Sequence, residues 1–305
     1  MDGEIRVGTS GYTFDDWRGI VYPTSVKGSA LPHYARLFDC VEINTTFYRV
    51  PPASLFEGML RHVSDDFVFL VKVPREMTHE RELADRVREP FIRAIEPLLR
   101  AEQLGGLLVQ FPFSFKGSDE SLDHVEHLGR ALAPTGIPIS VEFRHAGWFA
   151  ESVYAFLRER GLGLVNVDLP ELDNLPQRTN IVTSDVAYYR LHGRNRATWW
   201  AKSDNPHDRY DYLYRADQLN EWAEKAHDAV GGARVAYMMT NNCRLGQSVV
   251  SALQLAQRLD LPMPSRPPGA EPELFELSRE ELIEETLAKI EVARGSQKEA
   301  LWRAR

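Results

Sequence analysis

Carboxylate, amide and basic side chains recur at the ends of short apolar segments in this chain of 305 residues. Residues 41–48 read VEINTTFY, in which Glu42 and Asn44 alternate with Val41 and Ile43. Such alternation among β-branched residues is typical of a strand, whose side chains point to opposite faces in turn. Glu42 and Asn44 therefore share one face of an expected strand, and a carboxylate there requires polar neighbours or a chemical role.

The same pattern follows other apolar segments. Polar side chains occur at their ends at Ser10, Lys72, Gln110, Glu142, Arg144, Asn166, Asp168, Arg190, His192, Asn241 and Asn242. Carboxylates and histidines act as general acids and bases, lysine also acts as a nucleophile, and arginine binds anions. If the segments are parallel strands of one closed sheet, these groups meet at its carboxyl edge, where barrel enzymes carry their sites.

The expected layering of such a barrel assigns roles to these groups. We expect Glu42, Glu142, His192 and Lys72 to be the catalytic candidates. Glu142, between Lys72 and Arg190, is expected to stay ionised, whereas Glu42, among neutral amides without a cation, suits a general acid. The expected substrate-binding residues are Ser10, Asn44, Tyr48, His79, Gln110, Arg144, Arg190, Arg194 and Asn242.

Several functions fit these residues. Hydrolysis of a phosphoester in a small polar, phosphate-bearing substrate is the first, because basic side chains are abundant. Carbohydrate chemistry by Glu42 and Glu142 is the second, although strands across a barrel place them far apart for a retaining pair at ~5–5.5 Å. Schiff-base chemistry at Lys72 is the third, and it needs a neutral amine, which a nearby Glu142 opposes. A non-catalytic sensor of an anionic ligand would use the same residues.

No cofactor is predicted. Carboxylates and a histidine are present, but no spacing singles out a ligand set, so a divalent metal stays open. The two cysteines, Cys40 and Cys243, have neither metal-ligand spacing nor a disulfide framework. We expect Cys40 in the core and Cys243 more exposed, without a partner base.

Eight apolar segments alternate with helical patterns and would position these groups. The expected strands are residues 5–9, 40–44, 67–73, 106–111, 138–143, 162–168, 187–192 and 234–240. The alternation predicts an α/β fold of the (β/α)8 TIM-like barrel type over residues 1–261. Residues 169–186 show no clear helical pattern, so the sixth unit is expected to be irregular. Residues 192–214, rich in Trp, Tyr and Arg, are expected to form a lid over the mouth.

Residues 262–305 are expected to form a linker and a C-terminal helical appendage. The linker contains PMPSRPPGAEPE, and Ser278 with Glu281 forms an expected capping box. An apolar stripe follows at Leu282, Ile283, Leu287 and Ile290. This stripe suits docking on the barrel, and an oligomer contact is the alternative.

Composition limits the partners. The formal net charge of −8 disfavours a sequence-independent grip on nucleic acid or on an anionic membrane, whereas a local pocket for an anionic ligand is compatible with it. No apolar run approaches the roughly 20 residues of a membrane helix. The chain opens directly into an apolar strand without a signal-peptide pattern, so a cytoplasmic location is expected.

Six ordered motifs resemble the YecE-like family, catalogued as domain of unknown function 72. They are GTSGYTFDDWRGIVYP (8–23), VEINTTFY (41–48), FVFLVKVP with the following TH (67–79), QFPFSF (110–115), VEFRHAGWF (141–149) and YYRLHGRN (188–195). The resemblance implies a TIM-like barrel and no established reaction. Barrels of this kind have been likened to metal-cluster DNA-repair endonucleases, but this chain lacks the histidine-rich ligand set of those enzymes.

Overall fold

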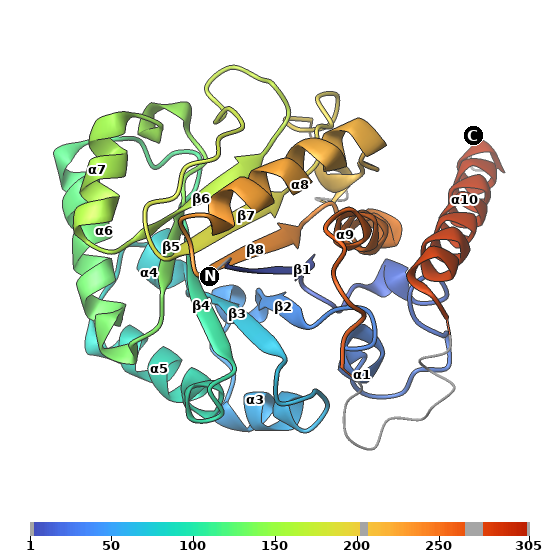
Figure 1. The fold of residues 1–305 in the computed structure, drawn as a ribbon, viewed down its shortest axis with the longest axis horizontal. Helices are drawn as coiled ribbons and strands as arrows, with labels where there is room; N and C mark the ends of the chain where they lie inside the picture. The colour runs from blue at the N-terminus through green and yellow to red at the C-terminus, as the bar shows by residue number, and fades with distance from the viewer. Residues whose placement is uncertain (1–2, 202–206, 266–276, 304–305) are drawn as a thin grey trace.

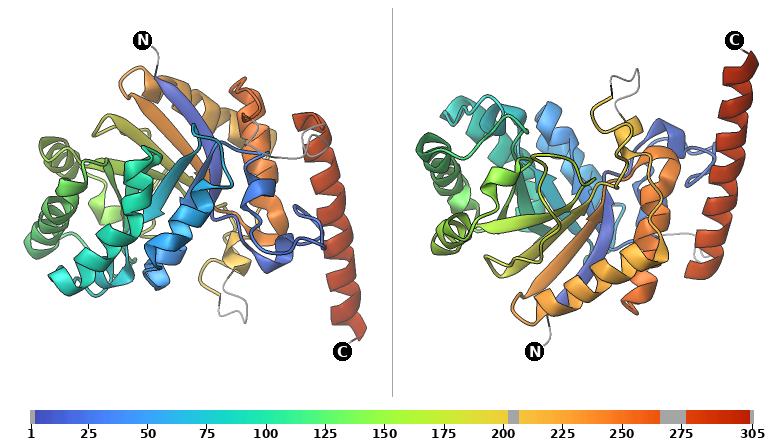
Figure 2. Two further views of the ribbon diagram at one scale, coloured as in Figure 1. Left: turned by 90° about the horizontal axis from the view of Figure 1, so that it is seen from below. Right: turned by 90° about the horizontal axis from the view of Figure 1, so that it is seen from above.

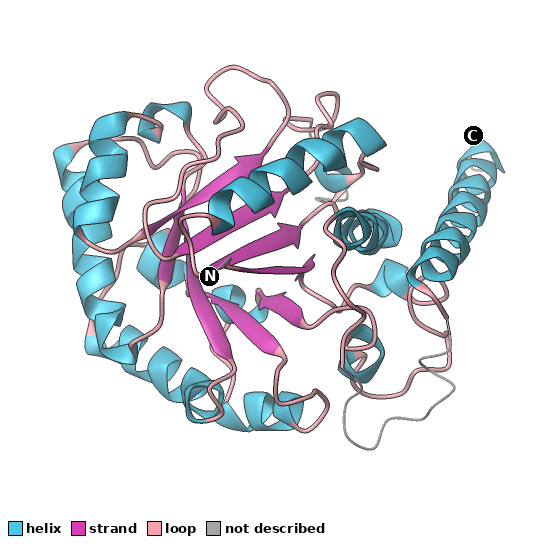
Figure 3. Cartoon of the chain, in the orientation of Figure 1, coloured by secondary structure: helices cyan, strands magenta, loops and turns pink. Residues whose placement is uncertain are grey.

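The computed structural model describes residues 3–201, 207–265 and 277–303. Eight parallel strands form a closed barrel in chain order, as predicted (Figures 1 and 3). The strands are β1 (Glu4–Ser10), β2 (Cys40–Ile43), β3 (Val68–Lys72), β4 (Leu104–Gln110), β5 (Ile139–Glu142), β6 (Gly163–Asp168), β7 (Val186–Leu191) and β8 (Val235–Thr240). The pairing of β1 with β8 closes the sheet, so none of its edges is left unpaired.

Helices surround the strands (Figure 1). The longer ones are α3 (Ala53–Leu60), α5 (Asp85–Arg100), α6 (Asp119–Leu132), α7 (Glu151–Glu159), α8 (Ala216–Val230), α9 (Gln247–Arg258) and α10 (Arg279–Arg303). Single-turn helices are α1 (Leu31–Tyr34), α2 (Thr45–Tyr48) and α4 (Arg75–Thr78). Short 3-10 turns are η1 (Asp15–Trp17), η2 (Ala133–Thr135), η3 (Ala146–Trp148), η4 (Asp208–Tyr210) and η5 (Arg244–Gly246). The connection from β6 to β7 contains no helix, which confirms the irregular sixth unit.

The apolar core has two layers, because every strand is covered on both faces. Side chains such as Val41, Ile43 and Phe111 pack outward against the helices. Side chains of the opposite parity, such as Leu70 and Leu108, fill the barrel interior. The two layers explain why the strands read as continuous apolar runs up to their polar carboxyl ends.

The polar side chains at the carboxyl ends of the strands occupy inward-facing positions. They lie together in one layer of the barrel, which we call the charged tier. Ser10 pairs in register with Glu42, and Gln110 pairs with Glu142, so these groups are neighbours across adjacent strands. The tier continues from β3 with Lys72. The prediction that polar groups converge at this end is therefore confirmed for most strands.

Strand β6 departs from the prediction. Val165 and Val167 fill the barrel interior, so Asn166 and Asp168 point outward. Asn166 holds the helix-free connection by accepting a hydrogen bond from the backbone of Ile181 at 2.9 Å. The expectation that Asp168 joins the mouth is wrong, since the first inward position past β6 is the apolar Leu169.

The C-terminal helix docks on the barrel as expected. The backbone amide of Ser278 donates to the side chain of Glu281 at 2.7 Å, and the backbone amide of Glu281 donates to the hydroxyl of Ser278 at 3.2 Å. The expected capping box is therefore confirmed. Ile283 and Ile290 are buried, and α10 packs against α9 and η5 (Figure 2). Residues 266–276 of the expected linker lie outside the described residues. An oligomer contact through this extension stays a prediction.

No helix in residues 3–201, 207–265 or 277–303 combines the length and apolar character needed to cross a membrane.

Candidate active site at the carboxyl mouth of the barrel

A cavity of about 620 Å³ opens at the carboxyl end of the strands. Its walls combine the ends of several strands with the loops that follow them. Expected site residues that line it are Ser10, Glu42, Asn44, Tyr48, Lys72, Gln110, Arg144 and Arg190. With Asn241, which follows β8, the mouth gathers residues from seven different strand ends, which only a closed sheet can bring together.

Arg190 is the centre of the charged tier. Its Nε and one terminal nitrogen donate to the two oxygens of Glu42 at 2.8 and 2.7 Å, and its other terminal nitrogen donates to Glu142 at 2.5 Å. The guanidinium is 3% exposed and both carboxylates are fully buried. One arginine thus neutralises much of the charge of two buried acids, an arrangement that its planar fork of donors permits.

Glu42 accepts two further hydrogen bonds. Tyr188 donates its hydroxyl to one oxygen at 2.8 Å, and Asn44 donates its amide to the other at 2.8 Å. The expectation that Glu42 lies among neutral amides without a cation is wrong, because Arg190 is long enough to reach across the tier. Glu42 is thus bonded to one cation, Arg190, and to the two neutral donors Tyr188 and Asn44.

Glu142 stays ionised, as expected. Burial alone raises the pKa of this carboxyl, but ion pairs with Arg144 and Arg190 outweigh burial and hold the pKa well below its usual range. Lys72 is not its direct partner, contrary to the expectation, since the two arginines occupy the carboxylate oxygens. A carboxylate held so strongly in its charged form is a poor acid and a poor base near neutral pH.

His192 lies behind Glu142, fully buried and away from the cavity wall. Burial and the neighbouring Arg144 lower its pKa to about 3, so the imidazole is neutral near pH 7. Asn241 donates to Nδ1 at 2.8 Å, which places the ring proton on Nε2, 3.5 Å from Glu142. His192 therefore packs beside Glu142 and does not line the cavity.

Lys72 is a cavity-wall residue whose proton affinity is strongly altered. Its Nζ donates to Gln110 at 2.8 Å and lies 3.8 Å from the centre of the Phe47 ring. Burial, followed by the charge of Arg190, lowers its pKa from 10.5 to about 7. A ring face favours the charged amine by about 0.5–2 kcal/mol, which is smaller than the effect of burial. Glu142 favours the charged amine, as expected, but burial and the charge of Arg190 outweigh its effect.

Three expected binding residues lie elsewhere. Arg194 forms ion pairs with Asp168 at 2.9 Å and with Glu221 at 3.0 Å, and so stabilises the β7–α8 region. Asn242 is fully buried and donates to Ser251, whereas Asn241 has the inward parity and lines the cavity. His79 stacks edge-on against Phe47, behind the cavity wall.

The sequence comparisons agree with this architecture. The family described as "Protein of unknown function DUF72" matches residues 6–273. The chain belongs to the DUF72 family. The UPF0759 protein YunF of Bacillus subtilis is 24% identical over 273 residues, which cover 84% of this chain and 95% of that protein. The UPF0759 protein YecE of Escherichia coli K12 is 31% identical over 150 residues, covering 48% of this chain and 53% of YecE.

Solved structures of other DUF72 proteins share the fold. A crystal structure of a family member from Thermotoga maritima has a TM-score of 0.76 and 38% identity, covering 84% of this chain and 99% of that one. A member from Enterococcus faecalis has a TM-score of 0.77 and 25% identity, covering 85% of this chain and 96% of that one. The family membership inferred from the six motifs is confirmed.

Sequence reasoning missed several residues that line the mouth of this DUF72 barrel. Tyr210 and His207 come from the expected lid segment, which gave a signal by its aromatic content, although residues 202–206 of it lie outside the described residues. Cys243 is buried, not exposed as expected, and its sulfur lies 3.8 Å from Nδ1 of His207. Burial raises the pKa of this thiol to about 12, which makes it a weak nucleophile.

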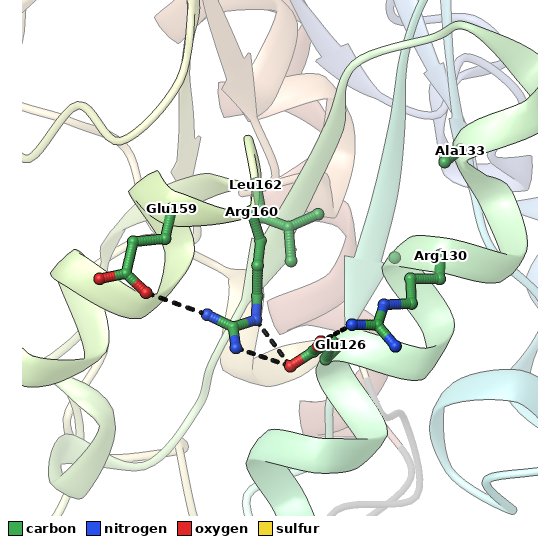
Figure 4. Close-up of a pocket in the computed structure, with 7 residues that line it drawn as sticks. Glu126, Arg130, Ala133, Glu159, Arg160 and Leu162 are labelled. Atoms are coloured by element: carbon green, nitrogen blue, oxygen red, sulfur yellow. Dashed lines mark hydrogen bonds and ion pairs between the residues drawn. The ribbon is translucent and has the colours of Figure 1, made fainter.

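A second hollow of about 440 Å³ lies between α6 and α7 of the DUF72 barrel (Figure 4). Glu126 bonds there to Arg130 and Arg160, and Arg160 also pairs with Glu159. These ion pairs join surface helices near the start of β6, at the amino end of the barrel, where residues serve stability more often than chemistry.

No group of three or more His, Cys, Asp or Glu side chains in the described part of this DUF72 chain is arranged to hold a metal ion.

Proposed function

We propose that this protein is an enzyme that binds a small anionic, phosphate-bearing substrate in the barrel mouth and uses Lys72 as its acid–base group. The observation that carries this proposal is the position of Lys72 and Arg144 on the wall of one cavity. With Lys72 protonated, the tier holds the cations Lys72, Arg144 and Arg190 against the carboxylates Glu42 and Glu142. An anion would balance the excess positive charge.

Phosphoester hydrolysis is the reaction that we propose first. Water would attack phosphorus and release one proton to solvent, and the bond to the leaving oxygen would break with its electron pair going to that oxygen. Lys72 would give that oxygen its proton and regain one from solvent. A pKa of about 7 suits such a transfer, because both forms of the amine are populated near neutral pH. Glu42, Glu142 and His192, the other expected acid–base candidates, would act indirectly by holding Arg190 and Arg144 in place.

The carbohydrate alternative is less well supported. A pair of carboxylates that cleaves a glycosidic bond needs one protonated member to serve as acid. Glu142 has a strongly lowered pKa, and Glu42 and Glu142 share one guanidinium. Neither carboxylate is therefore placed as a proton donor to a sugar.

Sulfate tests the anion site, since its charge does not change between pH 6 and pH 8.5. Millimolar sulfate should raise the melting temperature more at pH 6, where Lys72 is protonated, than at pH 8.5. In Lys72→Met and in Arg144→Gln, sulfate should raise the melting temperature by the same amount at pH 6 and at pH 8.5. Arg215→Gln changes an exposed arginine and should keep the larger sulfate effect at pH 6. This variant therefore serves as the control for the general stabilising effect of sulfate. An equal sulfate response in all four proteins would overturn the anion site.

Turnover separates an enzyme from a sensor. Lys72→Arg keeps a positive charge but cannot exchange a proton near pH 7. On any phosphomonoester that the protein hydrolyses, it should lower kcat by about 10²–10⁴-fold and leave KM within a few-fold. A broad panel of phosphomonoesters that gives no phosphate release, despite sulfate binding, would favour the non-catalytic ligand sensor.

A further inference from the structure

We propose that Lys72 also forms a covalent imine with the carbonyl carbon of a small anionic aldehyde or ketone. This inference rests on the proposed anion site, since Arg144 would hold the anionic group while the carbonyl approaches Nζ. It goes beyond acid–base chemistry because it makes Lys72 a nucleophile and names the carbonyl compounds as a substrate class.

The surroundings of Lys72 fix its amine at the edge of an open space. The side chain leaves the end of β3, is almost completely buried, and ends at the wall of the 620 Å³ cavity. Gln110 accepts a hydrogen bond from Nζ, and the ring of Phe47 covers one side of it. A positioned amine that reaches a ligand-sized cavity is the geometry that imine formation requires.

The charged groups around this amine favour its neutral, nucleophilic form. The carboxylates of the tier, Glu42 and Glu142, are bonded to Arg190, and Glu142 also pairs with Arg144. Burial and the two guanidinium groups therefore oppose a proton on Nζ more strongly than the carboxylates favour one. His79, which contacts the Phe47 ring edge-on, is held neutral by burial and adds no charge that would change this balance.

The reaction balances without a cofactor. The lone pair of Nζ forms a bond to the carbonyl carbon, the carbonyl oxygen takes up a proton, and the nitrogen releases one to water. The C–O bond of this carbinolamine then breaks, water leaves, and a C=N bond remains. Once protonated, the imine draws electrons from the neighbouring carbon, which allows an adjacent C–H or C–C bond to break. Glu142, whose pKa is held well below its usual range by Arg144 and Arg190, would stabilise the positive charge of that form.

Reductive trapping tests the inference on the full-length protein. Glycolaldehyde phosphate with cyanoborohydride converts an imine into a stable secondary amine, which peptide mass mapping locates. At pH 7, Lys72 should be modified at least ten times faster than Lys289, an exposed internal control. The rate at Lys72 should rise with pH through about 7 as the neutral fraction grows.

Variants and competitors separate the two proposals. Lys72→Arg should lose the modification at this position, whereas Lys289→Arg should leave the rate at Lys72 unchanged. Sulfate should slow trapping at Lys72, and neutral glycolaldehyde should react more slowly there than its phosphate. If Lys72 is trapped no faster than Lys289 while sulfate still gives its pH-dependent stabilisation, the imine is overturned and the anion site stands. If both aldehydes trap Lys72 equally and sulfate has no effect, Lys72 is a nucleophile, but the anion site and the anionic class of carbonyl substrate are both overturned.

Discussion

Arg190 and Glu42 form a two-pronged ion pair in the centre of the barrel mouth, although 148 positions separate them in the chain. The same guanidinium also reaches Glu142, so it bridges β2 and β5 from β7. Buried ion pairs add little net stability, because desolvation costs about as much as their attraction returns. Their value here is positional, since the ion pair of Glu142 with Arg144 holds that arginine at the cavity wall.

Removing the bridging charge should be costly. Arg190→Met leaves Glu42 and Glu142 buried without their shared partner, and we expect it to lower the free energy of unfolding by about 3–5 kcal/mol. Urea denaturation measures this loss. Arg215→Met, which removes an exposed arginine paired with Asp217, should leave the urea midpoint unchanged. A stable Arg190→Met protein with the wild-type midpoint would contradict the network as described.

Lys72 should make stability depend on pH in the alkaline range. Its pKa is about 7 in the folded protein against 10.5 for an ordinary lysine, so the folded chain binds the proton more weakly than the unfolded chain. The cost of the buried charge is complete below about pH 7 and is relieved as pH rises towards 10.5. The free energy of unfolding of the wild type, relative to Lys72→Met, should therefore rise between pH 7 and pH 10. A flat difference across this range would show that the amine is not perturbed.

The docking of α10 can be tested on one face of the helix. Ile290 is 2% exposed against the barrel, and Val292, two positions later, is 72% exposed. Ile290→Ala should lower the free energy of unfolding by about 2–5 kcal/mol in urea titrations, whereas Val292→Ala should have a small effect. Equal effects of the two changes would mean that α10 does not pack through this face in solution.

The turn after β7 depends on a glycine. Gly193 has φ of +90°, and an added Cβ would lie 2.6 Å from Cβ of Tyr212. Gly193→Ala should therefore cost more than about 1 kcal/mol of unfolding free energy, since both strain and a clash oppose it. Gly136→Ala is the matched control, because its φ is +69° with no atom within 4 Å of the added Cβ. Thermal denaturation should rank Gly193→Ala as the more damaging of the two.

Much of the fold followed from local patterns. The eight strands and the capped helix at Ser278 were predictable because each depends on side-chain period or on a contact within one turn. The polar residues at the strand ends were also identifiable, and most line the cavity. Asp168 was misplaced because β6 continues its apolar interior to Leu169, a shift of one position that moves a side chain to the other face. Asn242 was assigned in place of Asn241 for the same reason.

The sequence by itself determined the barrel, the end of it that carries polar groups, and the set of residues from which a site is built, because period and spacing are local properties. Only the tertiary structure decided which of these groups meet. Arg190 forms ion pairs with both carboxylates, whereas Lys72 bonds to Gln110 and contacts the ring of Phe47. Which groups pair depends on the length of side chains that extend across a closed sheet. Burial and neighbours that are far away in the chain then shift the pKa of each group.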